Sequence, residues 1–170
     1  MQYFLTGASG FIGKRLVKKI LEREGSTVFF LIRESDKESL EHLYEFWNCD
    51  SHRAIPVVGD LTQPLLGVSP ADRKKIGKKT AHFFHLAAIY DLNADAESQL
   101  RVNVQGTRNT VQFAEAIGAK HFHLFSSIAS AGLFEGLFRE DMFEEAEGLE
   151  HPYFRTKHDS EGIVRRECSI

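Results

Sequence analysis

The sequence predicts an α/β fold, a doubly wound parallel sheet with helices on both faces. Apolar runs of strand length alternate with amphipathic stretches of helix length along the whole chain, which is the pattern of repeated βαβ units. The run from Thr27 to Ile32 is almost continuously apolar, as expected for a strand buried on both faces of a parallel sheet. A glycine-rich turn over 7–13 stands between the first strand-like run and the first helix. The 170 residues are expected to form one domain or part of one.

The elements are expected in strict alternation. Residues 2–6 form the first strand, and 11–24 form an amphipathic helix that Gly25 ends. The apolar face of this helix carries Ile12, Leu16, Val17, Ile20 and Leu21. After the strand at 27–32, further strands are expected at 54–58, 82–86 and 121–125, and further helices at 35–47, 71–77, 97–117 and 152–168.

Composition and charge exclude several classes of protein. The formal net charge is −3, which argues against a nucleic-acid binder because such a protein normally carries a basic face. No apolar run reaches the length of a membrane span, and the N-terminus lacks the pattern of a secretory signal, so a cytoplasmic protein is expected. Cys49 and Cys168 lie far apart and are expected to be free thiols. The eight histidines show no metal-ligand spacing, so no metal is expected.

The glycine-rich turn predicts a phosphate-binding site. Gly7, Gly10 and Gly13 recur every third residue between a strand and a helix. Glycine lets the backbone approach a ligand closely, and the N-terminus of the following helix offers N–H groups to an anion. The common dinucleotide pattern is G-x-G-x-x-G, whereas the spacing here is G-x-x-G-x-x-G, so the triplet alone also fits a plain strand–helix turn. The βαβ context favours a dinucleotide.

Conspicuous residues also follow the other strands. In a doubly wound sheet, ligands bind at the carboxyl ends of the strands, where the strand order reverses. Arg33 follows the second strand, Asp60 the third, Ala87 and Ala88 the fourth, and Ser126 and Ser127 the fifth. We therefore expect these residues to meet the glycine turn in one site.

Five motifs, in this order, resemble the extended branch of the short-chain dehydrogenase/reductase superfamily. They are TGASGFIG at 6–13, GDLT at 59–62, HLAA at 85–88, NVQGT at 103–107 and YFRTK at 153–157. The resemblance covers essentially the whole chain and implies a Rossmann-type NAD(P)-binding domain over residues 1–170. The segment GDLTQPLLGVS at 59–69 is similar to the thioester-reductase or male-sterility group, which includes fatty acyl-CoA reductases and the reductase ends of carrier-protein assembly lines.

The resemblance implies catalytic roles for Tyr153 and Lys157, which lie one helical turn apart on the same face. A carbonyl that accepts hydride needs a proton donor at its oxygen, which would be Tyr153, and the ammonium of Lys157 would favour the phenolate. Ser127 is the expected hydroxyl that holds the substrate oxygen, with Ser126 left open, although a serine at a strand end can instead cap the backbone. Taken alone, Y-x-x-x-K also fits an ordinary amphipathic helix.

The residue after the second strand indicates which cofactor is bound. Proteins that use NAD place a carboxylate there for the ribose 2′-hydroxyl, while an arginine can bind the 2′-phosphate of NADP. The sequence has Arg33 at this position, with Ser35 near enough to assist, so NADP(H) is favoured over NAD(H). Glu34 would serve NAD(H) if the register slipped by one residue.

The resemblance also implies the remaining cofactor contacts. Asp60 would hydrogen-bond the adenine amine with Leu61 packed nearby, although an aspartate here also suits a plain turn. Asn103 stands inside a helix, where its propensity is low, which predicts a buried polar network near the site, with a solvent-facing side chain as the alternative. The expected cofactor-binding residues are Thr6, Gly7, Ser9, Gly10, Phe11, Ile12, Gly13, Arg33, Asp60, Leu61, Ala87, Ala88, Asn103, Tyr153 and Lys157.

Together these features predict an NADPH-dependent reductase of a carbonyl or acyl thioester, such as fatty acyl-CoA. The alternatives are a hydroxysteroid-type or sugar-nucleotide dehydrogenase or epimerase and, outside enzymes, a catalytically silent NADP-binding sensor. Members of the resembling family continue with a sixth strand and a substrate lobe. The chain is therefore expected to be a fragment, truncated before that strand, continuous with further C-terminal domains and unable to turn over substrate alone. A small molecule or acyl thioester is the expected partner, and a homodimer is left open.

Overall fold

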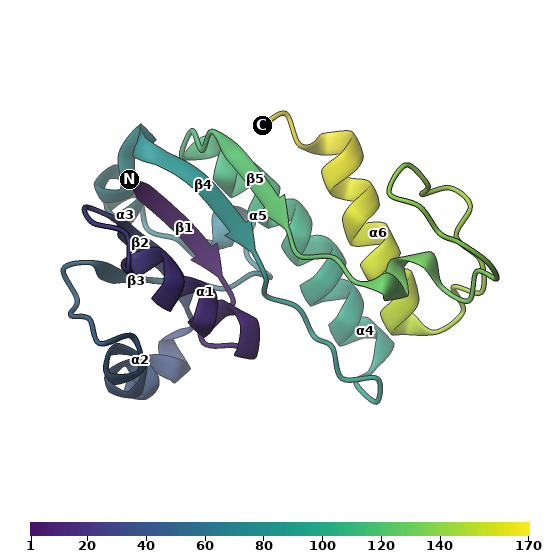
Figure 1. Cartoon of the computed structure of the whole chain (residues 1–170), viewed down its shortest axis with the longest axis horizontal. Helices are drawn as coiled ribbons and strands as arrows, with labels where there is room; N and C mark the ends of the chain where they lie inside the picture. The colour runs from purple at the N-terminus through teal and green to yellow at the C-terminus, as the bar shows by residue number, and fades with distance from the viewer.

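Five parallel strands form the sheet in the computed structural model, which describes residues 1–170 (Figure 1). They are β1 (Gln2–Thr6), β2 (Thr27–Ile32), β3 (Ala54–Val58), β4 (Thr80–His85) and β5 (His121–Leu124). Their order across the sheet is β3-β2-β1-β4-β5, which confirms the predicted doubly wound topology. The order reverses between β1 and β4, so a crevice for a ligand is expected above these two strands.

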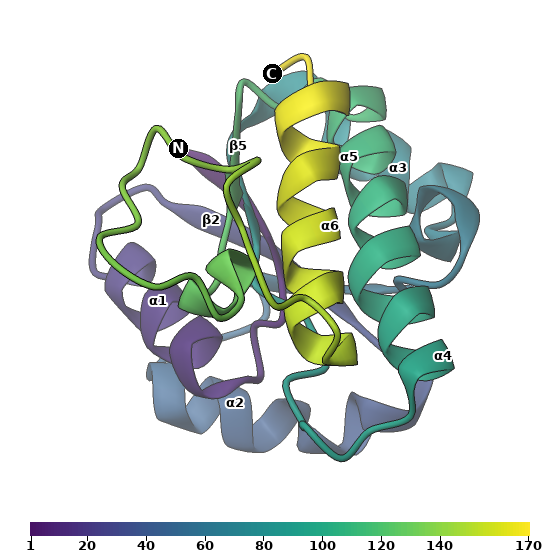
Figure 2. The ribbon, with the colours of Figure 1, turned by 90° about the vertical axis from the view of Figure 1, so that its right-hand side faces the viewer.

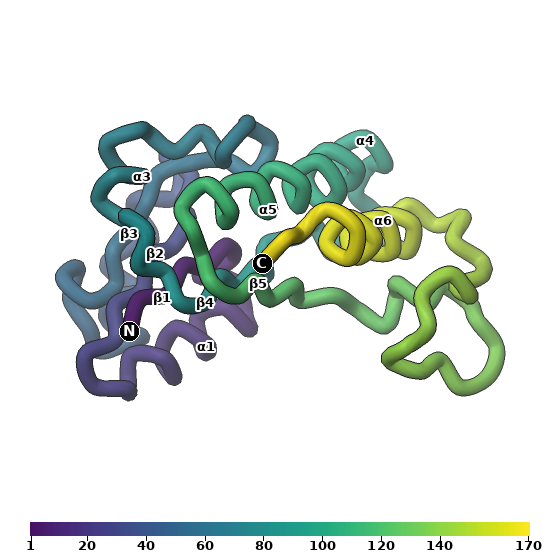
Figure 3. The backbone as a smooth tube through the Cα atoms, turned by 90° about the horizontal axis from the view of Figure 1, so that it is seen from above, coloured from purple at the N-terminus to yellow at the C-terminus, as the bar shows by residue number.

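Helices cover both faces of the sheet. They are α1 (Phe11–Leu21), α2 (Leu40–Trp47), α3 (Pro70–Ile76), α4 (Ala96–Gln99), α5 (Gly106–Ala116) and α6 (Pro152–Glu167). Seen from above, α1 lies on one side of the sheet and α3 and α5 lie on the other (Figure 3). The helix α6 runs beside α5 (Figure 2). None of these helices has the length and apolar character that crossing a membrane requires.

The two apolar layers follow from the alternation of side chains along β1 and β2. Tyr3 and Phe30 face the layer beneath α1 and α2, whereas Phe4 and Phe29 face the layer beneath α3 and α5. In the second layer, Phe4 stacks on Phe83 of β4 with their ring centroids 4.9 Å apart. Burying each such aromatic ring contributes roughly 1.5–3 kcal/mol, so the two layers fix β1 at the centre of the sheet.

The first helix differs from the sequence prediction at its N-terminus. Val17, Ile20 and Leu21 are buried and Leu16 packs against them, as predicted. Ile12 is 55% exposed and does not enter the core. It lies in the first turn of α1 and lines a cavity at the carboxyl ends of the strands.

Two predicted helices are divided. The stretch expected over 35–47 begins as a 3₁₀ turn, Glu34–Ser39, before α2. The stretch expected over 97–117 contains the π-helical segment Leu100–Gln105 between α4 and α5. The hydroxyl of Thr107 donates to the carbonyl of Asn103 at 2.6 Å, and the hydroxyl of Ser160 on α6 is shared between this carbonyl, at 2.8 Å, and Thr156 O, at 2.5 Å.

A buried hydrogen-bond chain joins β1, β4 and the start of α5, with the segment before it, at the point where the strand order reverses. His85 lies between two hydroxyls, with Nδ1 2.7 Å from Thr6 Oγ1 and Nε2 3.0 Å from Thr107 Oγ1. The proton of Thr107 goes to Asn103 O, so Nε2 carries a hydrogen and donates to Thr107, and Nδ1 accepts from Thr6. The N–H of Ala87 donates to Thr6 Oγ1 at 3.3 Å. We call these five residues the His85 relay.

The His85 relay predicts that acid destabilises the fold. Burial lowers the pKa of His85 to about 3, with a smaller contribution from the charge of Lys157. An unfolded histidine titrates near a pKa of about 6.5, so the unfolded chain binds the extra proton and stability falls as the pH drops below that value. At pH 5.5, His85 is expected to lower the free energy of unfolding by about 1.4 kcal/mol. Urea unfolding at pH 7.5 and 5.5 measures it.

A pair of variants isolates the part of this loss that comes from His85. His85→Asn should be less stable at both pH values but should show a smaller drop between them. Burial and neighbouring histidines also lower the pKa of His82 and of His123, so a residual drop remains. His52→Gln, which removes a histidine whose side chain is 89% exposed, is the matched control and should keep the full drop. An unchanged drop in His85→Asn would contradict the prediction.

Candidate active site

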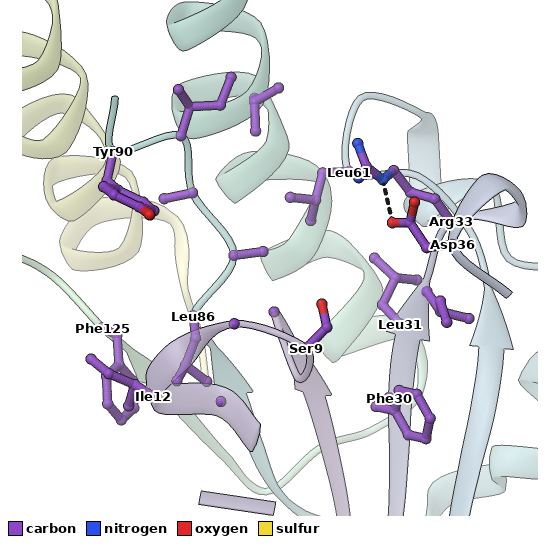
Figure 4. Close-up of a pocket in the computed structure, with 18 of the residues that line it drawn as sticks. Ser9, Ile12, Phe30, Leu31, Arg33, Asp36, Leu61, Leu86, Tyr90 and Phe125 are labelled. Carbon is purple, nitrogen blue, oxygen red and sulfur yellow. Dashed lines mark hydrogen bonds and ion pairs between the residues drawn. The ribbon is translucent and has the colours of Figure 1, made fainter. Parts of the chain in front are cut away.

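A cavity of about 830 Å³ lies at the carboxyl ends of the strands, above the point where the strand order reverses (Figure 4). Its walls come from the glycine turn, from the ends of β2, β3 and β4, from the residues after β5 and from the start of α6. This volume falls in the range of cofactor sites in proteins. Of the strand-end residues predicted to converge here, Arg33, Asp60, Ala87, Ala88 and Ser126 line the cavity, whereas Ser127 does not.

The glycine turn forms one wall, and its shape depends on two glycines. Gly7 has a φ of +75°, and the N–H of Gly10 donates to its carbonyl at 3.1 Å. A Cβ on Gly13 would lie 2.0 Å from Gly7 O, so only glycine allows α1 to start this close to β1. No side chain caps the N–H groups at the start of α1, and Phe11, Ile12 and Gly13 of its first turn line the cavity. Ser9 projects its hydroxyl into the cavity (Figure 4).

The wall beyond β2 carries a charged pair. Arg33 lines the cavity, and its Nε donates to Asp36 Oδ2 at 2.8 Å. Asp36 also lines the cavity, and the hydrogen bond from Arg33 outweighs partial burial to hold the pKa of its carboxyl below the usual value. Glu34 pairs with Lys37 at 2.7 Å and is not among the lining residues. The carboxylate nearest to Arg33 is therefore Asp36, which the sequence analysis missed.

The wall beyond β3 carries Asp60 and Leu61, which both line the cavity. Oδ1 of Asp60 accepts from the backbone N–H and the hydroxyl of Thr62, both at 2.8 Å. Asp60 thus makes the turn that the sequence offered as the alternative, and it does so at the cavity wall. Both bonds use Oδ1, so Oδ2 stays available to a ligand.

The wall beyond β4 is apolar, and the buried side chain of Asn103 holds its backbone. Ala87, Ala88 and Ile89 line the cavity. Asn103 is buried and lies outside the lining, where its side chain accepts from Ile89 N at 2.8 Å and donates to Ile89 O at 2.9 Å. Its amide also donates to Thr156 Oγ1 at 3.2 Å. The buried polar network predicted for Asn103 is present, and it positions the cavity wall.

Tyr153 and Lys157 both line the cavity from the first turns of α6. The helix starts at Pro152, and His151 caps it by accepting from the N–H of Tyr153 at 3.1 Å. Lys157 is buried, and its Nζ donates to Phe125 O at 3.1 Å. Burial lowers the pKa of this ammonium, and the nearby carboxylate of Glu161 opposes the shift.

The two candidate serines take different environments. Ser126 lines the cavity, and its hydroxyl donates to Glu161 Oε2 at 2.7 Å. Burial raises the pKa of Glu161, but hydrogen bonds from Ser126 and Arg165 leave it below its usual value. Ser127 is not among the lining residues, and its Oγ accepts from Ala129 N at 3.1 Å as a cap. The structure thus brings Ser126 to the cavity with Tyr153 and Lys157.

Three charged residues near the cavity escaped the sequence analysis. Asp36 and Arg101 line the cavity, and Glu161 binds the lining residue Ser126. Glu161 follows Lys157 by one helical turn. The four-residue spacing that placed Tyr153 and Lys157 on one helix face could therefore have placed Glu161 there too. Asp36 gave no signal, because the stretch over 35–47 was expected to be a helix.

Known proteins resemble this chain in sequence and in structure. The NAD-binding family described as Male sterility protein matches residues 5–169. A linear gramicidin synthase of Brevibacillus parabrevis is 31% identical over 94% of this chain and 3% of its own length. The putative fatty acyl-CoA reductase CG8306 of Drosophila melanogaster is 30% identical over 67% of this chain and 25% of its own length.

One solved structure is the terminal R domain from the myxalamid PKS-NRPS biosynthetic pathway. It is 27% identical with a TM-score of 0.80, over 96% of this chain and 44% of that chain. The chain therefore spans less than half the length of each of these relatives.

The close approach of α1 to β1 predicts a large cost for one glycine and a small one for its neighbour. Gly13→Ala should lower the free energy of unfolding by about 2–3 kcal/mol, because its Cβ meets backbone that must shift. Gly10→Ala should cost less than about 1 kcal/mol, because the nearest atom would lie 3.3 Å away and φ is −68°. Urea unfolding without ligand measures both, and equal losses would contradict the close approach.

Proposed function

The chain belongs to the male sterility protein family of NAD-binding domains, and we propose on that premise that it is the NADP(H)-binding part of an acyl thioester reductase. Fatty acyl-CoA is the substrate class that we favour. The observation that carries the proposal is the convergence of the glycine turn with Tyr153 and Lys157 on one cavity. Tyr153 would then be a proton donor, and Lys157 a buried cation, in the cavity that the glycine turn also lines.

The residues present fit a dinucleotide. The N–H groups at the start of α1 suit the pyrophosphate, because no side chain caps them and residues of this turn line the cavity. Asp60 and Leu61 would hold the adenine, and Arg33 the 2′-phosphate. Ala87 and Ala88 of the apolar wall, with Lys157, would hold the nicotinamide end, which supplies the hydride when the cofactor is bound.

The side chains of α6 would manage the proton. Tyr153 would give its hydroxyl proton to the carbonyl oxygen as hydride reaches the carbon. The ammonium of Lys157, fixed by its bond to Phe125 O, would stabilise the phenolate that remains. We assign the hydroxyl that holds the substrate oxygen to Ser127, which fits by its spacing to Gly132, and Ser126 is the alternative because it lines the cavity.

Substrate class can be tested in the natural protein that contains this chain. Its oxidation of NADPH would be followed with a panel of acyl-CoAs, steroids and nucleotide sugars. We expect oxidation that depends on acyl-CoA. Turnover only with steroids or nucleotide sugars would replace the thioester assignment with a dehydrogenase or epimerase, and no turnover with any class would favour a cofactor sensor. A larger loss of rate in Ser127→Ala than in Ser126→Ala would support the assignment of Ser127.

The role of Tyr153 predicts a loss of rate without a loss of cofactor binding. In the natural protein, Tyr153→Phe should lower kcat by about 10²–10⁴-fold, because the proton donor is removed. Its Kd for NADPH, measured by isothermal titration, should stay within about twofold of wild type. Tyr44→Phe, on α2 and outside the cavity lining, is the matched control and should keep full activity. A Tyr153→Phe variant that kept its rate would refute the mechanism.

A further inference from the structure

The charged pair beyond β2 is built into the cavity wall. Arg33 Nε donates to Asp36 Oδ2 at 2.8 Å, and the Ser35 hydroxyl donates to Asp36 Oδ1 at 2.9 Å. Both oxygens of the carboxylate therefore have partners. Figure 4 shows the pair beside Leu31 and Leu61, at the edge of the cavity where β2 ends.

The backbone fixes the carboxylate more firmly than the guanidinium. Asp36 lies inside the 3₁₀ turn Glu34–Ser39, where its N–H donates to Arg33 O at 3.0 Å and its carbonyl accepts from Ser39 Oγ at 2.6 Å. The Asp36 side chain is 34% exposed, whereas that of Arg33 is 70% exposed. Asp36 is thus the fixed member of the pair, and Arg33 is the member that can reorient towards a ligand.

The pair changes what Arg33 can do for a dinucleotide. A free guanidinium attracts a 2′-phosphate, which carries close to two negative charges, far more than it attracts a 2′-hydroxyl. Asp36 brings the net charge of the pair to zero and adds repulsion towards a phosphate. The same carboxylate can accept a hydrogen bond from a 2′-hydroxyl. Glu34 and Lys37 neutralise each other in the same turn, so they leave this balance unchanged.

We propose that Asp36 sets the cofactor selectivity of this chain by neutralising Arg33, so that NAD(H) competes with NADP(H) for the site. The proposal rests on the proposed function, in which the cavity holds the dinucleotide with its adenosine ribose at the end of β2. Arg33 supplies the preference for NADP(H), and Asp36 limits it. The residue acts at the ribose and takes no part in the proton transfer at Tyr153.

Isothermal titration of the natural protein that contains this chain, with NADPH and NADH, tests the proposal through the ratio of the two Kd values. Wild type should prefer NADPH by less than about tenfold. Asp36→Asn, which keeps the shape and one hydrogen-bond acceptor, should raise that preference about tenfold further, mainly by tightening NADPH. Arg33→Gln should reverse the preference. Glu34→Gln removes an equal charge from the same turn outside the cavity, so its ratio should stay within about twofold of wild type.

A second probe separates the ribose from the rest of the cofactor. Adenosine 2′,5′-bisphosphate and AMP differ only in the 2′-phosphate, and Asp36→Asn should improve binding of the bisphosphate alone. The proposal would be overturned if wild type bound NADPH but Asp36→Asn changed neither the NADPH/NADH ratio nor the bisphosphate/AMP ratio of Kd values. That outcome would leave the proposed function intact. Failure of wild type to bind either dinucleotide would overturn both.

Discussion

The His85 relay is the constraint on which the rest of this site depends. It starts at the N–H of Ala87, passes through Thr6 and His85, and ends at Thr107 and the carbonyl of Asn103. Each hydroxyl and the imidazole both donate and accept, so every buried donor in the relay has a hydrogen-bond partner. Because a protonated imidazole could not accept from Thr6, the arrangement requires neutral His85. It fixes the end of β1, the end of β4 and the helical segment behind them as one unit.

The cavity inherits its shape from this unit. The glycine turn leaves β1 directly after Thr6, and the apolar wall begins at Ala87, so both surfaces start from residues of the relay. Asn103 extends the unit in two directions. Its side chain holds the backbone of Ile89, and its carbonyl accepts from Ser160 on α6. The helix that carries Tyr153 and Lys157 is therefore tied to the same buried network as the glycine turn.

Sequence reasoning succeeded where the determining contacts are local. The strands could be predicted because their apolar runs are short and bounded, and the glycine turn because Gly7 and Gly13 contact each other across six residues. The π-helical segment around Asn103 could not be predicted, because one of the hydroxyls that stabilise it comes from Ser160, 57 residues further along the sequence. Ser126 and Ser127 posed a different difficulty, since adjacent residues at a strand end face opposite ways and a shift of one residue exchanges them.

The two ends of the cavity differ in how they are held, and under the proposed function this difference would separate proton transfer at Tyr153 from the choice of cofactor. At the α6 end, Lys157 is buried and donates to the backbone carbonyl of Phe125, so a change there disturbs packing as well as charge. At the β2 end, Arg33 and Asp36 lie on an exposed turn whose contacts are mostly internal to that turn. Substitutions among exposed charges usually alter stability by less than about 0.5 kcal/mol. Under the proposed function, substitutions in this turn can therefore change the selectivity between NADP(H) and NAD(H). The His85 relay, and the position of Tyr153 that depends on it, would stay as they are.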